Sequence, residues 1–283
     1  MAKLVEIIGV AHNPHYPRRM ANPTEEDPAM LAIRDSYAAM RTKMTEARPD
    51  VLLVVGNDHL NKLFMDNMPA FLVCKPFIAS GPPRWEREGG IPHVDATVHR
   101  DLARGIVQRG FDHGVDFSFS DEVQIDHAIT IPIHYVSPDP EHLPVVPIMT
   151  NVMTPPMPPA KRFFEVGQAI RSIIDEWPED IRVGVAASGH LAVEIGGPKG
   201  RGASPDIDFD HEAVDIIGRG DIDALMRHAS FERMAQAGNF TPGFLNFVML
   251  VGMSGGLPAS QSDLIVCKGS NPAPFFTWDL HKG

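Results

Sequence analysis

The sequence predicts an α/β fold: a single domain with a central, mostly parallel or mixed sheet flanked by helices. Short apolar runs rich in β-branched residues alternate along the chain with longer segments of helical apolar spacing. Three of these runs, at 4–10, 51–55 and 181–187, end abruptly in polar residues. Continuous apolar runs of this length are typical of buried parallel strands. We therefore expect one α/β domain over 1–283, with its functional site at the C-terminal ends of the strands.

The remaining elements follow from the same patterns. The segment 12–26 is predicted as a long polar loop broken by prolines, and 28–49 keeps an apolar stripe at helical spacing. The segment 79–92 is rich in Gly and Pro and is predicted as an irregular loop. The apolar segment 128–136 is predicted as either a short buried helix or a strand, because Pro132 argues against a long regular helix. Further strands are predicted at 71–74, 145–150 and 264–267, and further helices at 95–109, 161–177, 205–217, 221–228 and 244–253.

Composition narrows the class of protein. The net charge of −11 argues against general binding of nucleic acid. No apolar run approaches the roughly 20 residues that span a bilayer, and the chain opens with a strand pattern rather than a signal peptide. Cys74 and Cys267 lie in or next to apolar runs, which is typical of buried, reduced thiols. We expect a cytoplasmic protein that binds neither nucleic acid nor membrane.

Histidines follow three of the predicted strands. His12, His59 and His190 each come within about three residues of a strand's C-terminal end, the edge where open α/β sheets bind ligands. His127 stands at the start of the apolar segment 128–136. Imidazoles that converge at one edge indicate either a divalent metal or acid–base chemistry.

Several segments together resemble the class III extradiol ring-cleavage dioxygenases, the LigB-like superfamily of the protocatechuate 4,5-dioxygenase β subunit. The resemblance runs nearly from end to end, whereas no single substrate subfamily is indicated. The segments that carry it are the first strand with its histidine, PDVLLVVGNDH followed by DNMPAF, DHAITIPIHYV, VVPIMTN, SGHLAVEIGGP and AGNFTPGFLNFVMLVG.

The resemblance implies a non-haem Fe(II) oxidoreductase that cleaves a catechol-like ring with O2, in the catabolism of aromatic compounds. In that family two histidines and one glutamate hold Fe(II) on one face, leaving positions for a bidentate catecholate and for O2. The resemblance places the two histidine ligands at His12 and His59. It implies acid–base or substrate-binding roles for His127 and His190. It also implies an oligomer, either a homo-oligomer or a heteromer with a small or homologous subunit.

Two positions depart from the family pattern. The glutamate ligand of the family aligns with Gly243, and no carboxylate occurs between residues 239 and 262. The family's acid–base histidine aligns with Val193, and His190 stands three residues earlier.

Three explanations of the missing carboxylate are open. An acid elsewhere, such as Asp58 or Glu194, completes the site; water or an anion fills the gap beside Gly243; or iron is absent. The alternative to a dioxygenase is therefore a divergent homologue that acts as a hydrolase or lyase, or as a non-catalytic partner subunit.

Overall fold

The computed structural model describes residues 1–23, 28–199 and 204–280, and these build an eight-stranded mixed sheet in the order β6-β3-β7-β2-β8-β1-β10-β9. Its four central strands run parallel to one another. In spatial order they are β7 (Val145–Thr150), β2 (Val51–Asn57), β8 (Arg182–Gly189) and β1 (Lys3–Ala11). Every residue of β2 and β7 is buried, which matches their continuous apolar sequence. The predicted α/β class with a mostly parallel or mixed sheet is confirmed.

The edges of the sheet contain the antiparallel pairs. On one side β3 (Phe71–Cys74) pairs antiparallel with β7, and β6 (Ser118–Ser120) lies beyond it. On the other side β10 (Ala273–Trp278) pairs antiparallel with β1, and β9 (Gln261–Ile265) forms the outer strand. The C-terminal part of the chain thus returns to lie beside its first strand.

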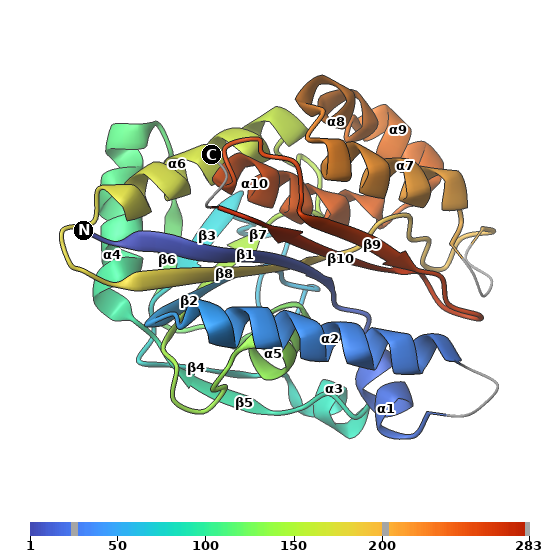
Figure 1. The fold of residues 1–283 in the computed structure, drawn as a ribbon, viewed down its shortest axis with the longest axis horizontal. Coiled ribbons are helices and arrows are strands. Elements are labelled where there is room, and N and C mark those ends of the chain that lie inside the picture. The colour runs from blue at the N-terminus through green and yellow to red at the C-terminus, as the bar shows by residue number, and fades with distance from the viewer. Residues whose placement is uncertain (24–27, 200–203, 281–283) are drawn as a thin grey trace.

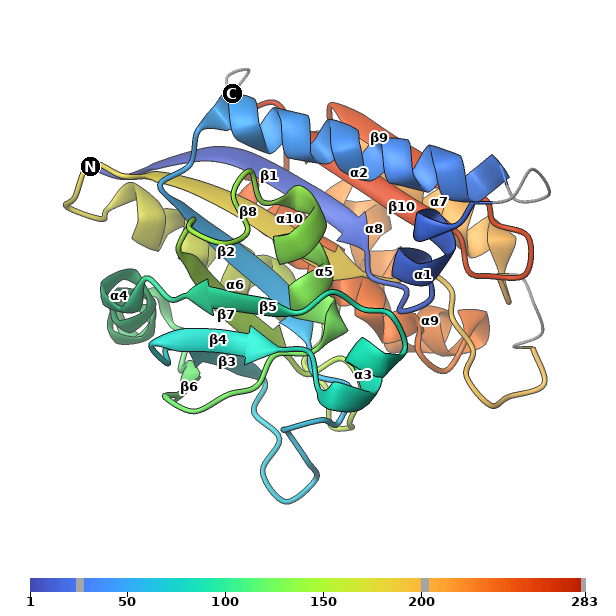
Figure 2. The same ribbon diagram turned by 90° about the horizontal axis from the view of Figure 1, so that it is seen from below.

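Helices cover both faces of the sheet (Figures 1 and 2). One face carries α2 (Pro28–Ala47) and α5 (His127–Val136), with α1 (Tyr16–Ala21) near the end of α2. The other face carries the packed pair α6 (Ala160–Asp175) and α10 (Leu245–Met253). Among the other helices, α4 (Arg100–Gly110) lies against β3 and β7, and α7 (Ile207–Arg219), α8 (Ile222–His228) and α9 (Phe231–Ala237) form a group.

The predicted helix patterns describe the core correctly. The apolar stripe of α2 is buried throughout, at Met30, Ile33, Tyr37, Met40 and Met44. Every residue of α10 is buried, which explains why that segment is apolar on all sides. None of the helices in the described ranges is long and apolar enough to cross a bilayer.

The structure corrects several local predictions. The predicted loop 79–92 contains strand β4 (Ile78–Gly81) and helix α3 (Arg84–Glu88), and the predicted helix 95–109 begins as strand β5 (Val94–Thr97) before α4. The predicted loop 12–26 contains α1, and its residues 24–26 lie outside the described ranges. These elements are four to six residues long. They are too short for an apolar period to be recognised, and tertiary packing decides their conformation.

Candidate functional site

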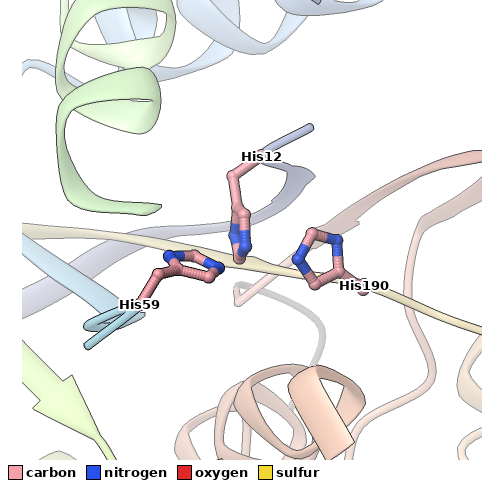
Figure 3. A group of neighbouring side chains, drawn as sticks. All are labelled: His12, His59 and His190. Atoms are coloured by element: carbon pink, nitrogen blue, oxygen red, sulfur yellow. The ribbon is translucent and has the colours of Figure 1, made fainter. Parts of the chain in front are cut away.

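Three adjacent strands bring three histidines together. His12 follows β1, His190 follows β8 and His59 lies just beyond β2, and these strands are neighbours in the sheet. One ring nitrogen from each histidine lies within 4.8 Å of the others. Figure 3 shows His59 and His190 on either side of His12, each with a nitrogen turned toward the space between the rings. The parallel strand order β2-β8-β1 is therefore what assembles the site.

The His12 ring is held by Ser188, the penultimate residue of β8. The Ser188 hydroxyl lies 2.7 Å from His12 Nδ1 and donates its own hydrogen to the carbonyl oxygen of Ala128. Because that hydrogen is used, the Ser188 oxygen accepts a hydrogen bond from His12 Nδ1–H. The lone pair of His12 is then on Nε2, which is buried and has no hydrogen-bond partner. An orphaned imidazole nitrogen facing two other imidazoles fits a metal ion.

The His59 ring is oriented by a buried carboxylate. The backbone N–H and Nδ1 of His59 both donate to Asp126 Oδ2, at 2.7 and 2.9 Å. This leaves Nε2 as the acceptor nitrogen. It accepts a hydrogen bond from the side-chain amide of Asn57, 3.1 Å away, which a bound metal would replace. Burial by itself raises the pKa of Asp126, but the electrostatic interaction and hydrogen bonds with His59 hold that pKa below its ordinary value. A carboxylate on the far nitrogen is the usual way in which proteins orient a metal-binding imidazole.

His127 opens helix α5 and stacks on His59, with ring centroids 4.1 Å apart. Its backbone N–H and its Nδ1 both donate to the Glu86 carboxylate, at 2.9 and 2.8 Å. Burial works to lower the pKa of His127, but the hydrogen bond to Glu86 and the nearby carboxylates leave it raised. His127 is therefore the member of the cluster best suited to hold a proton.

Burial favours the neutral form of the other two imidazoles. Burial lowers the pKa of His12 well below its ordinary value, and the neighbouring histidines add to this shift. Burial, together with the charges of His59 and His127, lowers the pKa of His190 to about 3. Neutral imidazoles have the free lone pairs that metal binding requires. The negative charge of the site comes from Asp126 and Glu86, each one hydrogen bond behind a ring.

All four histidines singled out in the sequence meet in this cluster, and their chemical roles stay predictions. Glu86, Ser188 and Asn57 were not assigned roles from the sequence. Ser188 and Asn57 lie at strand ends, two residues before His190 and His59. Their position in the sequence could therefore have identified them as site residues. Glu86 gave none, because it is 41 residues from His127 in a segment predicted as a loop.

The two acids proposed as replacement ligands each accept backbone N–H groups, although Asp58 Oδ1 is buried and has no hydrogen-bond partner. Asp58 Oδ2 accepts the backbone N–H groups of Asn61, Lys62 and Leu63, at 2.9 to 3.0 Å. Glu194 accepts the backbone N–H of Asn239 at 2.9 Å. Across the described ranges, neither acid belongs to a group of side chains close enough to share a metal with these histidines.

Comparison with known proteins gives a family and a fold. Residues 6–272 match the family described as the catalytic LigB subunit of aromatic ring-opening dioxygenase. A solved structure of an uncharacterized protein from Escherichia coli K12 superimposes with a TM-score of 0.63 at 18% identity, covering 97% of this chain and 100% of that one. At that identity the likeness concerns the fold alone.

Curated relatives include two kinds of dioxygenase. A 2,3-dihydroxyphenylpropionate/2,3-dihydroxicinnamic acid 1,2-dioxygenase from Xanthobacter autotrophicus is 30% identical over 64% of this chain and 55% of its own. Its counterpart from Photorhabdus laumondii is 27% identical over 56% of this chain and 48% of its own. A gallate dioxygenase from Pseudomonas putida is 33% identical over 46% of this chain and 39% of its own. The chain thus spans about half the length of the curated relatives it matches.

Proposed function

Because the chain belongs to the LigB family of aromatic ring-opening dioxygenases, we propose that it is an Fe(II)-dependent, extradiol-type dioxygenase that opens a catechol-like ring with O2. The observation that carries the proposal is the orphaned Nε2 of buried His12, which faces nitrogens of His59 and His190. The dioxygenases among the relatives support an aromatic substrate. We further propose that 1–283 forms one catalytic domain.

In this proposal His12 and His59 are metal ligands through their Nε2 atoms. Fe(II), when bound, would hold the catecholate and O2 together and let electrons pass from the ring to oxygen. Ser188 and Asp126 fix the two rings through their Nδ1–H groups, so that the ligand nitrogens are preorganised. His12 is buried, and His127 stacks on His59. Together they would exclude water from one side of the metal site.

His127 would serve as the acid and base. Its Nδ1–H is directed to Glu86, so Nε2 is the nitrogen left to exchange a proton with substrate. The raised pKa that the Glu86 hydrogen bond gives to His127 suits a group that must accept and return one proton. A cytoplasmic location and an oligomeric or heteromeric state belong to the same proposal.

The test is oxygen uptake coupled to ring opening. Protein purified without oxygen and loaded with Fe(II) should consume O2 and form a coloured ring-opened product with catechols that include 2,3-dihydroxyphenylpropionate and gallate. His59→Ala should abolish both signals, whereas His142→Ala, at an exposed histidine outside the cluster, should leave them unchanged. Metal binding without any O2 uptake across the panel would refute the dioxygenase.

The absence of the family's carboxylate ligand favours a second candidate function, that of a hydrolase, a lyase or a non-catalytic partner subunit. The stretch 239–262, which includes η2 (Thr241–Phe244) and all of α10, carries no carboxylate that could complete the family's ligand set. A hydrolase, a lyase or a non-catalytic partner subunit would give no oxygen uptake in the assay above. A partner subunit would also bind an active homologue, which co-purification from a shared expression strain detects.

A further inference from the structure

The room beside Gly243 is filled by His190. A Cβ atom added at Gly243 would lie 3.0 Å from His190 Cδ2 and 3.3 Å from the His190 backbone nitrogen. A Cβ atom added at Gly189, the residue before His190, would lie 2.6 Å from the carbonyl oxygen of Gly243. These two glycines let η2 press directly against the end of β8. The expected gap for water or an anion is therefore not there, because the imidazole stands in it.

His190 also fits the geometry of a shared metal better than His127 does. The ring planes of His12, His59 and His190 are inclined to one another by 65 to 80°, and each offers a nitrogen to the common space. His127 instead lies nearly parallel to His59, at an interplanar angle of 18°. Stacked rings direct their nitrogens side by side rather than toward one point.

The other group of possible ligands is already satisfied. It consists of His59, Asp126 and His127. Asp126 Oδ2 accepts three N–H donors, two from His59 and one from Asn61, and Oδ1 accepts the N–H of Ala128. Its oxygens therefore orient groups of the site and are not free to bind a metal.

We propose that His190 is the third metal ligand, in the position that Gly243 leaves open, so that three neutral imidazoles bind the metal. The proposal rests on the proposed function in taking the same metal site. Because no ligand carries charge, the metal keeps its full positive charge toward substrate, and its counter-charges, Asp126 and Glu86, stay one hydrogen bond behind His59 and His127. Such a centre favours an anionic bidentate substrate over a neutral one.

Co(II) is the probe, because each bound histidine keeps one exchangeable ring N–H that the paramagnetic ion shifts far from the diamagnetic proton spectrum. The wild-type protein should show three such signals, and His190→Ala should show two. The affinity of His190→Ala for Co(II) should fall by more than about 100-fold, beyond the usual effect of removing a hydrogen-bond partner of a ligand. His142→Ala, an exposed histidine, should keep three signals and wild-type affinity.

Two further variants separate ligation from a structural role. His190→Gly should regain Co(II) affinity when free imidazole is added, since imidazole can enter the space that the side chain leaves. Gly243→Glu alone should weaken Co(II) binding because its Cβ meets His190. The double variant His190→Ala/Gly243→Glu should recover the affinity with two N–H signals, as a set of two histidines and one carboxylate.

The outcomes distinguish this inference from the proposed function. If His190→Ala keeps three signals and wild-type affinity, the inference is wrong, while binding by His12 and His59 stands. The inference is also wrong if imidazole fails to restore binding to a folded His190→Gly protein. If the wild-type protein takes up no Co(II) or Fe(II), both proposals are overturned together.

Discussion

Replacing Asp126 with asparagine tests how the site is oriented. Asp126→Asn keeps the shape of the side chain and removes its charge. In the wild-type protein one carboxylate oxygen accepts both N–H groups of His59 and the amide of Asn61, and the other caps α5 through the N–H of Ala128. Asparagine has a single acceptor oxygen, so its NH2 group must face donors on one of the two sides.

The structure sets the size of two separate effects. If the NH2 group of the introduced asparagine faces a buried N–H donor, that donor has no acceptor. This should lower the free energy of unfolding by about 1–3 kcal/mol. Loss of the carboxylate behind His59 should weaken metal binding by about 10–100-fold, or about 1.4–2.7 kcal/mol. The two effects are independent, because the first acts on the metal-free protein as well.

The assay pairs urea denaturation of the metal-free protein with Co(II) titration of the folded protein. Asp35→Asn, an exposed position on α2, is the matched control and should change neither quantity. If Asp126→Asn destabilises the fold but binds Co(II) with wild-type affinity, Asp126 is only a helix cap. The account of His59 as a ligand held by this carboxylate would then be refuted.

Three more outcomes can be measured. Ser188→Ala removes the partner of His12 Nδ1 and should weaken Co(II) binding by about tenfold in the same titration, with little change in secondary structure by circular dichroism. Burial raises the pKa of Glu6 from 4.5 to about 7, so the folded state binds its proton more tightly and stability falls as pH rises through that range. Glu6→Gln should therefore raise the free energy of unfolding by about 1–2 kcal/mol at pH 8, after allowance for solvent screening, and leave it unchanged at pH 4; an equal gain at both pH values would contradict this reasoning. Gly56→Ala would place a Cβ 2.7 Å from the carbonyl oxygen of Ala128 and should cost about 1–3 kcal/mol in urea denaturation, because it pushes the start of α5 away from β2; wild-type stability would show that the helix start yields freely.

The sequence by itself determined the class of the fold and the position of three histidines. Continuous apolar runs identify buried parallel strands whatever their neighbours are, and His12, His59 and His190 are read directly as the residues after those runs. The same local logic placed α2, α6 and α10, because their apolar spacing persists over several turns. It could not detect β4 or α3, which are too short to show a period.

Only the tertiary structure decided which groups act together. The sheet order β2-β8-β1 makes the three histidines neighbours, and strand order is not encoded in any local pattern. Glu86 reaches His127 from a distant helix, and η2 brings Gly243 against His190. In the sequence, Gly243 stands where the family has a carboxylate. In the folded chain, the space beside Gly243 is occupied by the imidazole of His190. Long-range packing decides this, because a glycine's effect depends on what approaches it.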